Sequence, residues 1–218
     1  MLGKIIPEKI ASYTKYTNYV LYPLMGVFIL FAGLYGYMSY ANRKAEKLYN
    51  SGLMLLSDAL EKEDGPDHEK LNKAITILEK ISKYPTSRYH KLSMPFLGYI
   101  YFLKGDYNKA LVFYKGFKKK ISNSSVVYVS LTNLAISSCY EEKRKLGEAI
   151  KILERFSNEH PESPFREFAL LSLERLYRLS NNPGKAKKAI GEFLKEYPNS
   201  PFFYMAKARL LSYNNIKK

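Results

Sequence analysis

The sequence predicts an all-α protein: one transmembrane helix near the N-terminus, then an α-solenoid of about four helix pairs with a capping helix. Three observations support this prediction. Residues 16–42 contain no charged side chain. Three predicted helix ends share the same short element, a tyrosine or histidine followed by Pro-x-Ser. Four alanines recur at steps of 36, 39 and 37 residues, namely Ala74, Ala110, Ala149 and Ala186.

The uncharged stretch is long enough to cross a membrane. As a helix, residues 16–42 would be about 40 Å long, whereas a bilayer core of about 30 Å needs about 20 apolar residues. A cleaved signal peptide has an apolar region of only about 7 to 15 residues. We therefore expect an uncleaved anchor behind a basic segment at residues 1–15. Cleavage near Ser39-Tyr40-Ala41 and a buried core helix are the alternatives.

Small residues in the anchor and charges beside it bear on assembly and orientation. Ala32 and Gly36 form a small-xxx-small pair, which can bring two transmembrane helices together and predicts a homodimer contact. The flanking charges are balanced, because each side carries three basic residues and one glutamate: Lys4, Lys9, Lys15 and Glu8 before the stretch, and Arg43, Lys44, Lys47 and Glu46 after it. Charge therefore does not decide on which side of the membrane the C-terminal part lies.

Composition limits the classes of protein to consider. About 175 residues follow the anchor, which is enough for one domain with a substantial core. The single cysteine, Cys139, excludes an intramolecular disulfide framework and is expected to be a buried thiol. The net charge of +15 could attract anionic lipid, nucleic acid or acidic partners.

Residues 43–213 have the spacing of helical repeats. In the clearest unit, residues 91–124, seven positions keep the mutual spacing of a tetratricopeptide repeat: Leu97, Gly98, Tyr101, Gly105, Tyr107, Ala110 and Tyr114. The next two units have corresponding residues, namely Tyr140, Ala149, Leu153, Phe156 and Pro161, then Leu173, Tyr177, Ala186, Ile190, Phe193 and Pro198. An earlier, less regular unit has Gly52, Ala74, Leu78 and Ile81, with a turn signal at residues 63–67. These residues predict a tetratricopeptide-type solenoid.

The element that joins the units has a clear physical role. It occurs at residues 84–87, 160–163 and 197–200. Its proline stops the outgoing helix, and its serine can cap the incoming one. The β-prone run at residues 126–129 opens a helix-period pattern, so we interpret it as helical. A final helix at residues 202–213 should cap the stack, and residues 214–218 should form a frayed tail.

The sequence contains no constellation that predicts catalysis. His68, His90 and His160 lie in three different repeats and lack a zinc-binding spacing. No nucleophile motif, Walker loop or dinucleotide fingerprint is present. Glu141 and Glu142 are adjacent, so on a helix they diverge by about 100°. We expect no enzyme activity, no metal and no cofactor.

A ligand of a solenoid would bind to the concave face, which is lined mainly by the first helix of each unit. The repeat pattern places an apolar and aromatic set with arginine at one end on that face: Leu92, Tyr99, Phe102, Leu103, Leu134, Ser138, Phe168, Leu171, Arg175 and Arg178. Such a surface could take an extended or helical peptide. The alternative is that several of these residues pack against the next repeat.

The densest basic run is a second candidate surface. It consists of Lys115, Lys118, Lys119 and Lys120. These lysines can complement the dipole at a helix C-terminus, or contact anionic lipid or an acidic partner. Few aromatic residues are interleaved with them, which disfavours nucleic acid as a ligand.

The layout of the chain resembles the YfgM-type family of bacterial inner-membrane proteins, ancillary subunits of the SecYEG translocon. The resemblance covers the short basic N-terminus, the single span and the helix that runs through residues 40–60 into the repeats. It implies a single-pass inner-membrane protein with a cytoplasmic N-terminus and a periplasmic repeat domain. Its partners would then be the translocon and envelope chaperones. The strongly basic domain departs from what we would assume of that family.

Three functional hypotheses follow. The first is a membrane-anchored interaction scaffold that faces the envelope and takes part in protein export or chaperone handover. The second is a cytoplasmic-facing assembly factor for a membrane complex, recruited through the basic face. The third is an outer-envelope or cell-division-linked repeat adaptor. The Tyr-Pro-x-Ser joints resemble those of outer-membrane assembly lipoproteins, but the chain has no lipobox cysteine.

Overall fold

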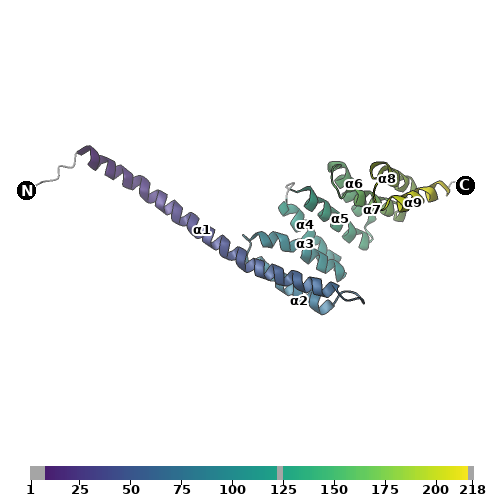
Figure 1. Cartoon of the computed structure of the whole chain (residues 1–218), viewed down its shortest axis with the longest axis horizontal. Helices are drawn as coiled ribbons and strands as arrows, with labels where there is room; N and C mark the ends of the chain where they lie inside the picture. The colour runs from purple at the N-terminus through teal and green to yellow at the C-terminus, as the bar shows by residue number, and fades with distance from the viewer. Residues whose placement is uncertain (1–7, 122–124, 216–218) are drawn as a thin grey trace, which may run out of the picture.

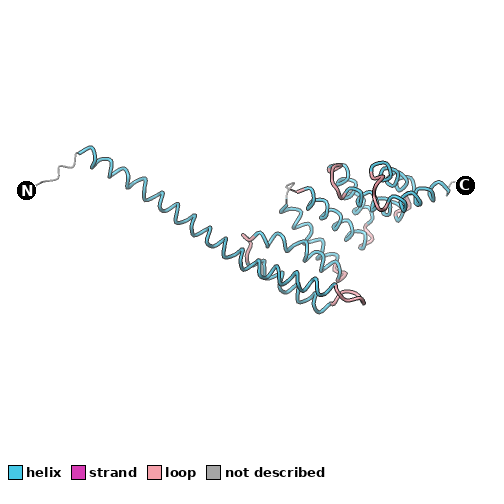
Figure 2. Tube along the Cα trace, in the orientation of Figure 1, coloured by secondary structure: helices cyan, strands magenta, loops and turns pink. Residues whose placement is uncertain are grey.

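The computed structural model describes residues 8–121 and 125–215, which are helical and contain no strand (Figure 2). This confirms the all-α prediction. The helices are α1 (Glu8–Leu60), α2 (His68–Glu79), the 3-10 helix η1 (Lys80–Lys83), α3 (Arg88–Leu103), α4 (Tyr107–Ile121), α5 (Val126–Glu142), α6 (Leu146–Glu159), α7 (Arg166–Leu179), α8 (Pro183–Glu196) and α9 (Phe203–Asn215). Residues 1–7 and 216–218, which include parts of the predicted basic segment and tail, lie outside the described residues.

Helix α1 has two different halves. Its N-terminal half projects away from the other helices, and its C-terminal half packs against them (Figure 1). Between Tyr19 and Leu60, an 18-residue window has a mean hydropathy of 1.7 and no buried residue, so the helix is long and apolar enough to cross a membrane. From Tyr19 onward, the first fully buried side chains along α1 are those of Ala41 and Ala45. The helix therefore runs without a break from the candidate span into the first repeat.

Within the described residues, the C-terminal half of α1 and the α-helices after it form four hairpins and a cap. Helices α1 and α2, α3 and α4, α5 and α6, and α7 and α8 pack as pairs, and α9 packs on α8. The four recurring alanines are completely buried, as expected where two helices approach closely. A Cβ on Gly98 would lie 2.8 Å from the ring of Tyr114, so this position requires glycine. These contacts produce a tetratricopeptide-like solenoid.

The three joints between units have the same hydrogen bonds. The N–H groups of Ser87, Ser163 and Ser200 donate to the carbonyl three residues earlier at 3.0, 3.1 and 3.1 Å. Each serine Oγ then accepts from the N–H two residues later, at 3.2 Å in every case. The predicted capping is confirmed at Ser87, which is the N-cap of α3. At the other two joints the serine hydroxyl accepts from Phe165 and Phe202, which lie in the turn just before α7 and α9.

The core has two main parts that meet at α5. The first lies among α1 to α5 and includes Cys139, whose thiol pKa burial raises to about 11. The second lies among α5 to α9. Tyr140 packs against both parts. Helix α5 therefore joins the two halves of the solenoid.

Candidate binding groove

An apolar groove lies between the first helices of three consecutive units. It has a volume of about 440 Å³ and is formed by α1, α3 and α5 together with α4. Six of its eleven lining residues are aromatic and none is charged: Tyr49, Leu92, Pro95, Phe96, Tyr99, Tyr114, Phe117, Tyr128, Leu131, Thr132 and Ala135. This composition is typical of sites that bind apolar or aromatic ligand groups.

Helical periodicity places these side chains on common faces. In α5, Tyr128, Leu131 and Ala135 are spaced i, i+3 and i+7, so they lie along one side of the helix. In α3, Leu92 and Tyr99 are seven residues apart, or about two helical turns, so they also lie on one face of the helix. Each helix therefore contributes one continuous stripe to the groove.

The groove has a buried floor and an exposed rim. Phe117 is 2% exposed and Tyr114 is 6% exposed, and burial raises the pKa of the Tyr114 phenol. On the rim, Tyr99, Tyr128 and Leu131 are 38%, 45% and 45% exposed. A ligand can therefore reach the rim while the floor stays packed.

Contacts between rings hold the floor and rim together. The ring centroid of Tyr49 lies 5.2 Å from that of Tyr89 and 5.7 Å from that of Phe96. The rings of Phe117 and Tyr128 meet edge to face at 5.8 Å. Such aromatic pairs prefer these geometries and restrict side-chain motion. The groove is therefore largely preformed.

The structure brings only part of the predicted groove together. Leu92 and Tyr99 line the cavity. Phe102 and Leu103 pack against the first core, and Leu134 and Leu171 against the second. The other four predicted residues contact neighbouring side chains or backbone. The ring centroid of Phe168 lies 6.0 Å from that of Phe202, and the Ser138 hydroxyl donates to the Leu134 carbonyl at 3.1 Å. Arg175 forms an ion pair with Glu141, and Arg178 forms one with Glu174 at 3.5 Å. As a binding surface, these eight residues remain a prediction.

Most of the residues that line the cavity were not predicted from the sequence. Tyr49, Phe96, Tyr128 and Leu131 were not in the predicted set, although they form its walls. The spacing of Tyr128, Leu131 and Ala135 is visible in the sequence and would have indicated a common face. The repeat pattern placed Leu134 on the groove instead.

The basic run lies at the end of α4. Lys118, Lys119 and Lys120 are in its last turn, where cations complement the helix dipole. Lys115 Nζ donates to the Tyr140 hydroxyl at 2.7 Å, and Lys118 Nζ to Asn133 Oδ1 at 2.6 Å. Burial is the largest cause that lowers the pKa of Lys118. Two of the four lysines are thus tied to α5, and binding of lipid or an acidic partner by this run remains a prediction.

The remaining candidates lie apart from the groove. Ala32 and Gly36 are exposed on the projecting half of α1, where a Cβ on Gly36 would meet nothing within 4 Å. A homodimer contact there remains a prediction. Within the described residues, no group of three or more His, Cys, Asp or Glu side chains could hold a metal ion.

Comparison with known proteins supports the repeat architecture. Residues 133–163 match the tetratricopeptide repeat model. A crystal structure of a putative kinesin light chain with nearly identical TPR-like repeats from Podosopora anserina is similar, with a TM-score of 0.61 at 13% identity over 80% of this chain and 87% of that chain. A point variant of the same protein also has a TM-score of 0.61 at 13% identity, over 81% of this chain and 87% of that chain. No curated protein matches the chain at a significant level.

Proposed function

We propose that the protein is a membrane-anchored scaffold that binds an apolar segment of a partner polypeptide in the groove between α1, α3 and α5. The tetratricopeptide-like solenoid is a fold that mediates protein–protein interaction. The observation that carries the proposal is a preformed groove of about 440 Å³ with six aromatic lining residues and no charged one.

The chemistry of the groove specifies the kind of segment that fits. Its exposed tyrosine and leucine side chains offer apolar area, and the phenol groups offer hydrogen bonds at the rim. An amphipathic helix fills such a groove with anchors at i, i+3 or i+4, and i+7. We expect a segment with large apolar anchors on one face.

The anchor would place this groove close to a bilayer. Tyr49 lies seven residues beyond Asn42 on the same helix, which is about 10 Å along its axis. A bound segment would therefore lie near the membrane surface. Together with the family resemblance in layout, this supports a role in handing newly exported polypeptides to envelope chaperones.

Peptide binding tests the groove. Full-length protein in detergent is titrated with amphipathic helical peptides that carry leucine and phenylalanine anchors. Tyr99→Ala combined with Leu131→Ala should weaken binding about tenfold or more, since each residue is partly exposed and loses contact area with the peptide. Tyr204→Ala combined with Leu211→Ala, on exposed positions of α9, is the matched control. Equal affinities for the two double variants would contradict the groove.

Protease accessibility tests the placement. In spheroplasts with a permeabilised outer membrane, digestion of the solenoid would place it in the periplasm and support the export role. Protection until the inner membrane is broken would contradict that role and leave a cytoplasmic scaffold.

A further inference from the structure

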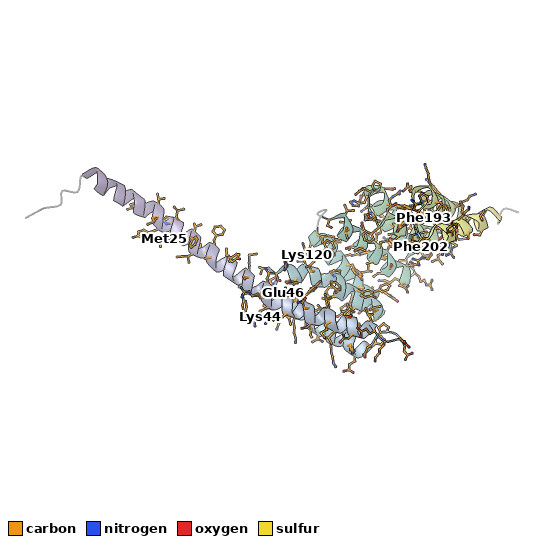
Figure 3. The ribbon with its side chains drawn as sticks, in the orientation of Figure 1. Met25, Lys44, Glu46, Lys120, Phe193 and Phe202 are labelled. Carbon is orange, nitrogen blue, oxygen red and sulfur yellow. The ribbon has the colours of Figure 1, made fainter. Side chains whose placement is uncertain are left out.

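A second cavity lies where α1 leaves the solenoid, near Glu46 in Figure 3. Its volume is about 290 Å³. One end is lined by Tyr35 and Met38 from the uncharged stretch of α1, and the other by Arg43, Arg88 and Tyr89. The cavity therefore has an apolar end and a cationic end.

Specific hydrogen bonds build this junction. The Oδ1 of Asn42 accepts from the Ser87 hydroxyl at 2.8 Å and from the Arg88 N–H at 3.1 Å. These bonds attach the start of α3 to the last uncharged residue of the stretch at residues 16–42. Arg43 on α1 and Arg88 on α3 are far apart in sequence, but both thus line this cavity.

Both guanidinium groups are available to an anion. Within the described part of the chain, neither Arg43 nor Arg88 lies within 4.0 Å of a carboxylate oxygen in an ion pair. Arg88 instead donates to the Tyr89 hydroxyl at 2.9 Å and lies 4.9 Å from the centroid of that ring. Glu46 is the one carboxylate that lines the cavity, so the two arginines leave a net positive charge.

The position of the cavity along α1 suits a lipid. Tyr35 and Met38 precede Arg43 by eight and five residues, or about 12 and 8 Å. Both are exposed, at 77% and 46%. If the uncharged stretch spans a bilayer, these side chains lie at acyl-chain depth and the arginines lie at the level of the headgroup phosphates.

We propose that this cavity binds an anionic phospholipid, with Arg43 and Arg88 on the headgroup phosphate and Tyr35 and Met38 against the upper acyl chain. A guanidinium group can donate two parallel hydrogen bonds to two oxygens of one phosphate. A lipid seated here would contact α1 and α3 at once and hold the solenoid at a defined angle to the membrane. The proposal depends on the membrane anchoring proposed above.

Native mass spectrometry of the full-length protein in detergent tests the site. The protein is titrated in parallel with phosphatidylglycerol, phosphatidylcholine and inorganic phosphate. We expect retention of one phosphatidylglycerol in preference to phosphatidylcholine. Arg43→Gln combined with Arg88→Gln should reduce that affinity about tenfold or more, because two cationic contacts are lost. Lys187→Gln combined with Lys207→Gln removes the same charge from exposed positions on α8 and α9 and should leave retention unchanged.

The other outcomes contradict the site. Equal losses in the two double variants would show only non-specific attraction by net charge. Inorganic phosphate that competes as well as the lipid would identify a free anion as the ligand. Carbonate extraction separates the two proposals: a chain that leaves the membrane contradicts the anchor, whereas an integral chain without phosphatidylglycerol preference contradicts the lipid site alone.

Discussion

The first two and the last two units of the solenoid use the same repeat but are held together differently. In the second unit, Gly98 lies twelve residues before the buried Ala110 and allows close contact with Tyr114. The corresponding position in the last unit, twelve residues before Ala186, is Glu174, which is completely buried. Its carboxylate accepts from the Tyr213 hydroxyl and from Arg209 Nη1 at 2.8 Å, both on α9. One repeat position therefore serves packing within a hairpin in one unit and attachment of the cap in another.

The ion pairs show the same difference. In the first half, the pairs of Lys62 with Asp67 and Lys73 with Glu69 involve lysines that are 59% and 60% exposed. Such surface pairs contribute about 0 to 1 kcal/mol each. In the second half, Arg166 has a side chain only 8% exposed, and it pairs with Glu192 and Glu196. The second half thus adds ion pairs with a buried partner to its apolar core, whereas the lysines of these first-half pairs are exposed.

The substitution that should destabilise the protein most removes a buried carboxylate in the second half. Glu174→Ala should lower the free energy of unfolding by about 3 to 5 kcal/mol, because Arg209 and Tyr213 lose their acceptor. Thermal unfolding of the full-length protein in detergent, followed by circular dichroism, measures it. Glu167→Ala, on the same helix, should cost about 0.5 kcal/mol or less. Similar costs for the two variants would show that the Glu174 contacts do not hold the cap.

The next largest loss of stability should come from disturbing the close packing in the first half. Gly98→Ala should cost about 1 to 3 kcal/mol, because its Cβ would lie 2.8 to 2.9 Å from the Tyr114 ring. Gly191→Ala, in the interior of α8 with nothing within 4 Å, should instead stabilise the protein by about 0.5 to 1 kcal/mol. Urea unfolding compares the two. Stabilisation by both changes would mean that the first half is not closely packed there.

The joints allow a finer comparison. Ser163→Ala should cost about 1 to 2 kcal/mol, since its Oγ accepts from the Phe165 N–H in the turn before α7 and also bonds the Ser130 hydroxyl at 2.7 Å. Ser200→Ala removes a turn hydrogen bond of the same length, 3.2 Å, from a serine without a second side-chain bond, so it should cost about 0.5 to 1 kcal/mol. Urea unfolding again measures both. A reversed order would contradict the importance of the Ser163–Ser130 bond.

The smallest effect concerns pH. A hydrogen bond from Lys62, followed by the N–H of Lys70, lowers the pKa of Asp67 to about 2, below its usual 3.8. The folded state therefore binds this proton less readily than the unfolded state. Its stabilising contribution is complete above about pH 4 and is lost as the pH falls towards 2. The thermal midpoints of the wild type and Asp67→Asn should converge over that range, and parallel curves would contradict the assignment.

The elements whose signals are local could be predicted from the amino-acid sequence. The uncharged stretch indicated α1, and the β-prone run at residues 126–129 was correctly interpreted as the start of α5. Alanine spacing and the Pro-x-Ser joints predicted the hairpins, the turns between them and the cap at Ser87, because these depend on backbone geometry and on neighbours a few residues away. The cap helix begins at Phe203 and ends at Asn215, one and two residues from its predicted bounds.

Which helix faces stay open depends on how the helices pack against one another. Successive residues of a helix point about 100° apart, so a choice between Leu131 and Leu134 depends on how α5 lies against its neighbours on both sides. Leu131 lines the groove, whereas Leu134 packs into the second core. Asn42 brings Arg43 and Arg88 to one cavity, and α9 supplies the partners of Glu174. These contacts join residues 35 or more positions apart, and local periodicity carries no information about such pairs.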